Sequence, residues 1–177
     1  MRAIVKSLAV GSLVAAPLLF LASPAHAFTN VSVSGGTLTI TSGNAADNIT
    51  VSRSGSFITI SNPADAPLPS GSCTRSGSLV RCPAGSVVRL VINTGNGSDR
   101  VSNTTNLPTT ASLGVGFDTY NGGSGRDNVF GGAGQDTLNG NGGDDTLDGG
   151  ADGGDRANGG AGSDLCRAES ETACERN

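Results

Sequence analysis

Large aromatic side chains are almost absent from this 177-residue sequence, which contains no tryptophan, one tyrosine and five phenylalanines. Conventional cores depend on such rings, because each one buries roughly 150–250 Å². Glycine, in contrast, accounts for 28 residues, about twice the usual share of roughly 7%. This composition disfavours an ordinary α/β or helix-bundle enzyme. Three classes stay open: a disordered chain, a collagen-like chain, or a repetitive β architecture stabilised by something besides hydrophobic burial.

Histidine and lysine are equally scarce, and the single copy of each lies within residues 1–27. This segment is typical of a secretory signal peptide: Arg2 and Lys6 give it a positive start, residues 8–21 are mainly apolar, and small residues precede a cleavage point at Ala27. The apolar run is shorter than the roughly 20 residues that a membrane-spanning helix needs. We therefore expect cleavage after Ala27 and a secreted, extracellular product with no membrane anchor.

Cleavage would leave residues 28–177 with nine arginines, fifteen acidic residues and a net charge of −6. Without histidine or lysine, the mature chain could not form Ser-His-Asp or Cys-His nucleophilic sites, histidine zinc sites or Schiff-base lysines. An acidic chain without a basic patch is also a poor candidate for nucleic-acid binding. We expect neither enzyme activity nor a nucleic-acid partner.

The four cysteines are Cys73, Cys82, Cys166 and Cys174. An even number in an exported protein favours disulfide bonds. Three connectivities are possible, and the pairs Cys73–Cys82 and Cys166–Cys174 are favoured because they need only short loops. A zinc cluster is the alternative, but these spacings do not match known zinc motifs.

Glycine and aspartate are concentrated in residues 113–167, which hold 18 glycines and nine aspartates. This block repeats every nine residues, with copies beginning at residues 113, 122, 131, 140, 149 and 159; the copy that begins at 149 has ten residues. The sixth position of each copy is an aspartate: Asp118, Asp127, Asp136, Asp145, Asp155 and Asp164. A fixed short period of this kind indicates a repeat architecture.

The pattern Gly-Gly-x-Gly-x-Asp-x-(apolar)-x resembles the haemolysin-type, or RTX, calcium-binding nonapeptide repeat. The resemblance implies an all-β fold, a right-handed parallel β-roll or β-solenoid in which two nonapeptides complete one coil. It also implies bound Ca²⁺, shared by turns two repeats apart. The implied metal-site residues are the six aspartates above and the glycines at positions one and four, namely Gly122, Gly125, Gly131, Gly134, Gly140 and Gly143.

The residue types suit that geometry on physical grounds. Stacked coils place equivalent residues about 5 Å apart, where two carboxylates repel by roughly 3 kcal/mol at an effective dielectric near 20. A cation between successive turns reverses the sign, and carboxylate and carbonyl oxygens suit Ca²⁺ better than a transition metal. We expect Asp127 with Asp145 to form the best site. The alternative is a disordered glycine-rich linker, above all in the absence of calcium.

The predicted edges and core follow from the same stacking. One edge of the roll would carry Asp118, Asp136 and Asp155, and the other Asp127, Asp145 and Asp164. The apolar eighth positions, among them Val129, Leu138 and Leu147, would point inward and form a narrow core without large rings.

Residues 28–112 are rich in serine and threonine and alternate as β-strands do. Strands are predicted at 31–33, 38–40, 49–51, 57–60 and 87–92. Asp47 and Asp99 stand at the sixth position of two weaker copies of the repeat. We expect this half to continue and cap the roll; a separate small β domain is the alternative.

The C-terminal tail, residues 168–177, follows the last repeat. A Cys166–Cys174 bond would fold it back over the open end of the roll, where solenoids need a cap. A loose tail with a local bridge is the alternative.

The whole layout resembles small exported calcium-binding repeat proteins of actinobacteria. We expect a secreted, monomeric calcium-binding protein with a structural, surface or interaction role and calcium ions as partners. One alternative is part of an extracellular hydrolase, with Asp47, Asp65 or Asp99 as glycosidase carboxylates. The other is an adhesion or carbohydrate-binding module, for which the expected aromatic platforms are lacking.

Overall fold

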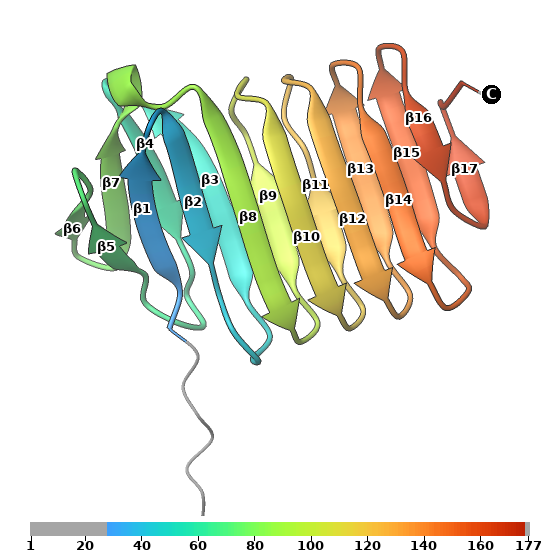
Figure 1. The fold of residues 1–177 in the computed structure, drawn as a ribbon, viewed down its shortest axis with the longest axis horizontal. Coiled ribbons are helices and arrows are strands. Elements are labelled where there is room, and N and C mark those ends of the chain that lie inside the picture. The colour runs from blue at the N-terminus through green and yellow to red at the C-terminus, as the bar shows by residue number, and fades with distance from the viewer. Residues whose placement is uncertain (1–27, 176–177) are drawn as a thin grey trace, which may run out of the picture.

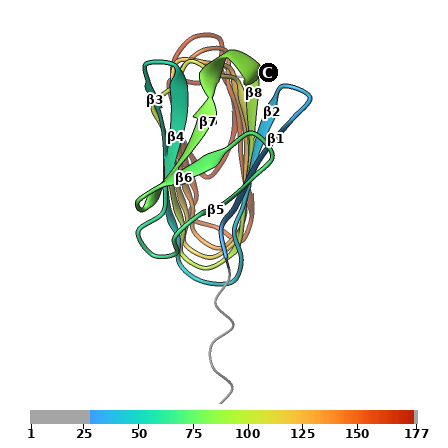
Figure 2. The same ribbon diagram turned by 90° about the vertical axis from the view of Figure 1, so that its left-hand side faces the viewer.

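The computed structural model describes residues 28–175, and the predicted signal peptide, residues 1–27, lies outside them. The described chain consists of two β-sheets that face each other across a narrow core (Figures 1 and 2). Apart from a 3₁₀ turn, η1 (Ala84–Ser86), these residues contain no helix. They therefore include no helix of the length and apolarity that crossing a membrane requires.

The first sheet has eight strands in the order β16-β14-β12-β10-β8-β2-β1-β5. In chain order they are β1 (Asn30–Ser34), β2 (Thr37–Thr41), β5 (Leu68–Ser70), β8 (Arg89–Asn96), β10 (Thr109–Val115), β12 (Asp127–Ala133), β14 (Thr146–Ala151) and β16 (Leu165–Arg167).

The second sheet has nine strands in the order β17-β15-β13-β11-β9-β3-β4-β7-β6. They are β3 (Asn48–Ser54), β4 (Phe57–Ser61), β6 (Thr74–Ser76), β7 (Leu79–Pro83), β9 (Arg100–Asn103), β11 (Thr119–Asn121), β13 (Thr137–Gly142), β15 (Arg156–Ala161) and β17 (Ser170–Thr172).

Consecutive strands from β8 onward alternate between the two sheets, so that two strands form one coil (Figure 1). Neighbours within a sheet are parallel: Thr119 pairs with Thr137, and Thr137 pairs with Arg156. Each coil therefore takes up two repeats, which confirms the all-β class and the parallel roll predicted from the sequence.

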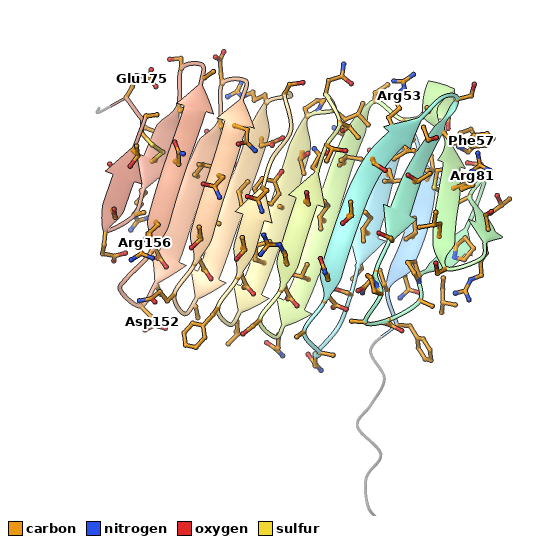
Figure 3. The ribbon with its side chains drawn as sticks, turned by 180° about the vertical axis from the view of Figure 1, so that it is seen from behind. Arg53, Phe57, Arg81, Asp152, Arg156 and Glu175 are labelled. Carbon is orange, nitrogen blue, oxygen red and sulfur yellow. A yellow bond between two sulfur atoms is a disulfide. The ribbon has the colours of Figure 1, made fainter. Side chains whose placement is uncertain are left out.

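The N-terminal end of the two sheets is built mainly from antiparallel pairs instead. β1 pairs with β2, β3 with β4, β4 with β7 and β7 with β6, all antiparallel, whereas β5 pairs in parallel with β1. β2 and β3 then pair in parallel with β8 and β9, so both sheets run without a break into the repeats. Figure 3 shows Arg81 of β7 beside Phe57 of β4 at this end; its guanidinium carbon lies 4.2 Å from the ring centroid.

The core changes in character along the molecule. At the N-terminal end it consists of large aliphatic side chains, and many of these are fully buried: Val31, Leu38, Ile40, Ile49, Val51, Ile58, Ile60, Val80, Leu90 and Ile92. In the repeats it narrows to the eighth positions, which are buried as predicted: Tyr120, Val129, Leu138, Leu147 and Ala157. The repeats thus bury about one apolar side chain per nine residues.

Both predicted disulfide bonds are present, Cys73–Cys82 and Cys166–Cys174. The first ties the segment before β6 to β7, and the second ties β16 to the tail. Short loops of this kind contribute roughly 2–3 kcal/mol each in the chain-entropy description.

Candidate metal centre

The six predicted aspartates lie at the turns between the sheets, and each is at most 2% exposed. The residues that follow them fix their alignment: Thr119, Thr137 and Arg156 are paired in one sheet, and Asn128, Thr146 and Leu165 in the other. One edge of the roll therefore carries Asp118, Asp136 and Asp155, and the opposite edge carries Asp127, Asp145 and Asp164.

On each edge, the Oδ1 atom of every aspartate accepts a hydrogen bond from the backbone N–H of the equivalent residue in the preceding coil. The Asp118 N–H donates to Asp136 Oδ1 (2.9 Å), and the Asp136 N–H donates to Asp155 Oδ1 (2.8 Å). On the opposite edge, the Asp127 N–H donates to Asp145 Oδ1 (2.7 Å) and the Asp145 N–H to Asp164 Oδ1 (2.8 Å). We call these rows the first ladder and the second ladder. Hydrogen bonds to a charged acceptor are the stronger kind, so the ladders fix the positions of the carboxylates.

The first ladder extends beyond the repeats into the N-terminal half. The Asp47 N–H donates to Asp99 Oδ1 (2.8 Å), and the Asp99 N–H donates to Asp118 Oδ1 (2.7 Å). The sequence placed Asp47 and Asp99 at the sixth position of weak repeats but did not assign them to the metal site. Their sixth-position placement was the sequence signal that could have assigned them to the same row of aspartates.

The second carboxylate oxygen, Oδ2, is buried and without a hydrogen-bond donor in most of these aspartates. Within residues 28–175 this holds for Asp47, Asp99, Asp118, Asp136, Asp145 and Asp164. Asp127 differs, because the Tyr120 hydroxyl donates to its Oδ2 (3.0 Å). An unsatisfied buried polar group costs roughly 1–3 kcal/mol, and more when it is charged. A cation bound to these Oδ2 atoms would offset the cost of burying them.

In the copies that begin at residue 122 and later, the first-position glycine lies directly against the Oδ2 atom of the aspartate in the same repeat. A Cβ built on Gly122 would collide with Asp127 Oδ2 and with the carbonyl oxygen of Gly140. The next copies repeat the arrangement: Gly131 faces Asp136 Oδ2 and the Gly149 carbonyl, and Gly140 faces Asp145 Oδ2 and the Gly159 carbonyl. We call this space, bounded by the Oδ2 of one repeat and a carbonyl oxygen of the next coil, a glycine cradle. Any side chain at position one would fill it.

The fourth glycines have a different role. Gly134 and Gly143 have φ angles of 125° and 113°, which side chains rarely tolerate. A Cβ on Gly125 would collide with the backbone of Asn106 and Leu107. Of the predicted metal-site glycines, the first-position ones therefore border the carboxylates, and the fourth-position ones allow the turns to stack.

The donor set of a glycine cradle fits Ca²⁺. It consists only of carboxylate and carbonyl oxygens, which are hard ligands that suit Ca²⁺ rather than a soft transition metal. Within the described chain, no group of three Asp, Glu, His or Cys side chains converges on one point. A site here would therefore combine few carboxylates with main-chain carbonyls and water.

Glycine cradles are confined to the later copies of the repeat. Residue 113, at the first position of the copy with Asp118, is a buried leucine. At the equivalent place in the preceding coil, the Thr94 hydroxyl donates to the Leu113 carbonyl (2.6 Å), and Ser42 donates in turn to the Thr94 carbonyl (3.1 Å). Asp118 therefore belongs to the first ladder but has no glycine cradle.

Burial raises the pKa of these carboxyl groups. It raises the pKa of Asp118 and of Asp127 to about 6, and it also raises the pKa of Asp99, Asp136 and Asp145. The main cause is loss of solvation, and neighbouring carboxylates on the same ladder add to it at several positions.

These raised pKa values predict opposite pH dependences with and without calcium. Without calcium, Asp118 and Asp127 keep their protons in the folded state up to about pH 6, whereas the unfolded chain releases them near pH 4. These two groups therefore stabilise the folded state fully below pH 4, and that stabilisation is lost as the pH rises through 6. With calcium, ionised carboxylates are needed, so affinity falls as the pH drops below 6. We expect the chelated protein to melt higher at about pH 5 than at about pH 7.5, and the calcium-loaded protein to show the reverse order. Thermal melts followed by circular dichroism measure both; the same order in both conditions would contradict the prediction.

A separate hollow of about 500 Å³ does not suit a cation. It is lined by Arg89, Leu90, Pro108, Thr109, Thr110, Arg126, Asn128 and Thr146. Its two charged side chains are both arginines, so it is distinct in character from the glycine cradles.

Comparison with known families agrees with this geometry. Residues 121–153 match the family model described as the RTX calcium-binding nonapeptide repeat (4 copies). The match begins next to Gly122, where the glycine cradles begin. No curated protein and no solved structure gives a significant match to the chain.

Proposed function

We propose, from the premise that residues 121–153 are RTX calcium-binding nonapeptide repeats, that this chain is a secreted calcium-binding protein. Calcium ions held between stacked turns would complete a core that is poor in apolar side chains. The role of such a protein would be structural, at a surface or in an interaction, rather than catalytic.

The observation that carries this proposal is the repetition of buried Oδ2 atoms without donors, each against a first-position glycine. Asp136, Asp145 and Asp164 have this arrangement. Because the ladder hydrogen bonds hold Oδ1 in place, Oδ2 stays directed at the cradle. Bound calcium would supply the positive charge that these oxygens lack.

The ligands proposed are Oδ2 of Asp127, Asp136, Asp145 and Asp164 with the first-position carbonyl of the next coil. Asp127 is included because a carboxylate oxygen that accepts one hydrogen bond, here from Tyr120, keeps a second lone pair. A Cβ built on Gly149 would also collide with the Asp155 side chain, Oδ2 included. Asp118, which lacks a first-position glycine, is the weakest of the predicted ligands.

The proposal of an extracellular location rests on two features. Both cysteine pairs form disulfides, and disulfides persist mainly in oxidising compartments. Extracellular calcium modules also bind with Kd values of about 10⁻⁴–10⁻³ M, a range in which sites with few carboxylates remain useful.

A non-catalytic role is supported by the chemistry of the described residues. Residues 28–175 contain neither histidine nor lysine, and their four cysteines are all in disulfides. The glycosidase alternative needs an accessible pair of carboxylates. Asp47 and Asp99 are buried, and Asp65 Oδ2 accepts the Thr29 N–H (2.6 Å).

Isothermal titration calorimetry with Ca²⁺ tests the proposed function directly. We expect more than one ion per chain and a change in far-UV circular dichroism on binding. Mg²⁺ serves as the control, because it demands a tighter octahedron and keeps its water, so it should bind more weakly. No heat and an unchanged spectrum with Ca²⁺ would overturn the proposal.

A further inference from the structure

The tail after the last repeat continues the coil although its sequence does not continue the repeat. β17 pairs in parallel with β15, with Ser170 beside Arg156. A further bridge joins Leu165 to Glu175. Residues 168–175 therefore lie where another pair of repeats would lie.

Glu169 ends the first ladder. It stands immediately before Ser170, as Asp155 stands before Arg156, and so occupies the sixth position of a missing repeat. The Asp155 N–H donates to Glu169 Oε2 (2.9 Å), as the Asp136 N–H donates to Asp155 Oδ1. This hydrogen bond lowers the pKa of the Glu169 carboxyl.

Glu175 ends the second ladder in the same way. The Asp164 N–H donates to Glu175 Oε2, as the Asp145 N–H donates to Asp164 Oδ1. The Glu175 N–H donates to the Asp164 carbonyl (2.7 Å), as the Leu165 N–H does to the Asp145 carbonyl (2.8 Å). Glu175 thus lies one position later than the aspartates, and its extra methylene lets the carboxylate reach back.

The tail also supplies the carbonyl oxygen of a glycine cradle. A Cβ built on Gly159 would collide with Asp164 Oδ2 and with the Ala173 carbonyl oxygen. In the preceding coil, Gly140 meets Asp145 Oδ2 and the Gly159 carbonyl. Asp164 is 2% exposed, and its Oδ2 has no hydrogen-bond donor. Ala173 has a φ angle of 49°, which is uncommon for a residue other than glycine.

We propose that the tail completes a terminal calcium site at Gly159 and Asp164. Ala173 supplies the main-chain carbonyl and Glu175 the carboxylate that a further repeat would otherwise provide. This inference rests on the proposed function, since it assigns additional ligands of the same kind. It extends the calcium-binding region beyond residues 121–153, to a part of the chain without nonapeptide sequence.

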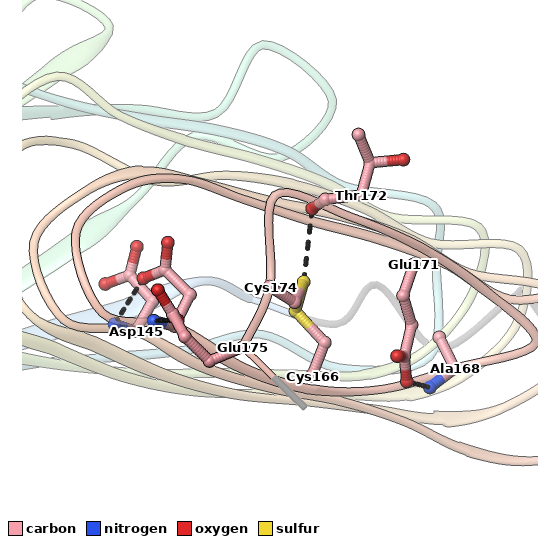
Figure 4. The surroundings of a disulfide bond; sticks show 8 residues. Asp145, Cys166, Ala168, Glu171, Thr172, Cys174 and Glu175 are labelled. Carbon is pink, nitrogen blue, oxygen red and sulfur yellow. Dashed lines mark hydrogen bonds between the residues drawn. A yellow bond between two sulfur atoms is a disulfide. The ribbon is translucent and has the colours of Figure 1, made fainter. Parts of the chain in front are cut away.

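The Cys166–Cys174 disulfide holds these ligands in place. Figure 4 shows it beside Glu175, which points toward the ladder that contains Asp145. Cys166 occupies the eighth position of the last repeat, and Cys174 lies between Ala173 and Glu175. The cross-link therefore holds the two proposed tail ligands, the Ala173 carbonyl and the Glu175 carboxylate, against the last coil.

The test is calcium titration calorimetry on the protein and on Glu175→Gln. The glutamine keeps an oxygen that can accept the Asp164 N–H, so the ladder hydrogen bond survives while the charge is lost. We expect one ion fewer per chain, or one site weakened at least tenfold. Glu171→Gln is the matched control: Glu171 lies in the same tail and accepts the Ala168 N–H (3.1 Å), but it belongs to neither ladder. It should bind calcium as the unchanged protein does.

A second variant keeps Glu175 and removes the cross-link. Cys166→Ser with Cys174→Ser should lose the same terminal site, and Cys73–Cys82 remains intact. If the unchanged protein binds no calcium, the proposed function itself fails. If it binds calcium and both variants keep every site at full affinity, the terminal site is wrong. An equal loss in Glu171→Gln would also overturn it, because the effect would then reflect the charge of the tail in general.

Discussion

Asp145→Asn is expected to stabilise the calcium-free protein and to weaken calcium binding by at least tenfold. Asp145 Oδ2 is a buried oxygen to which no protein group donates a hydrogen bond. An asparagine keeps Oδ1 as acceptor for the Asp127 N–H and places an amide N–H near the Gly159 carbonyl, which borders the same cradle. The substitution therefore removes an unpaired charge and adds a donor where a carbonyl can accept it.

The two effects can be separated by melting the protein in chelator and in excess calcium. Relief of one unsatisfied buried group corresponds to about 1–3 kcal/mol, which is a shift of several degrees in a chain of this size. The midpoint should rise in chelator and fall in calcium. Asp144→Asn is the matched control, since the neighbouring Asp144 is exposed and accepts the Ser163 N–H (3.0 Å). A lower midpoint in both conditions would show that Asp145 has only a structural role.

The repeats were predictable from the sequence because each residue in them meets the same surroundings every coil. A period of nine with an apolar eighth position fixes which side chains point inward, as Leu138 and Leu147 do. The stacking of aspartates two repeats apart needed the resemblance to the RTX repeat in addition, because that resemblance implies two nonapeptides per coil. The cysteine pairs followed from loop length alone.

The ends of the molecule were not predictable in the same detail. Alternating residues in the N-terminal half predict strands but not their partners, so the antiparallel pairing of β3, β4, β7 and β6 could not be distinguished from further coils. Strand β8 also begins only at Arg89, because the turn at Ala84–Ser86 precedes it. Glu169 and Glu175 have no repeat spacing, and only the folded tail brings them onto the ladders.

The difference between the two halves of the core has its largest consequence when calcium is removed. Ile40, Ile58 and Ile92 belong to a dense aliphatic cluster, and fully burying such side chains contributes about 1.5–3 kcal/mol each. The equivalent cradle position in this half carries the Ser42 and Thr94 hydroxyls, which donate to carbonyl oxygens. Nothing in this half therefore needs a cation except the first-ladder carboxylates.

In the repeats, by contrast, little apolar surface is buried relative to the free-energy cost of ordering the chain. They bury one apolar side chain per nine residues, against a backbone ordering cost of about 1–2 kcal/mol for each residue. Four of their six aspartate Oδ2 atoms are buried without a hydrogen-bond donor, and calcium at 100 times Kd would stabilise each site by about 2.7 kcal/mol. Two such sites already match the lower end of the stability of a typical domain, about 5 kcal/mol.

Chelation is therefore expected to lower the stability of β12–β17 against local unfolding, while β1–β4, β7 and β8 keep theirs. Hydrogen–deuterium exchange in calcium and in chelator measures this residue range by residue range. Amides of residues 127–161 should exchange on the order of a hundredfold faster or more without calcium, whereas those of residues 31–61 should change little. The N-terminal half is the internal control, because both halves share the same two sheets. Equal acceleration in both halves would mean that the sheets unfold as one cooperative unit and that calcium stabilises the whole chain rather than the repeats.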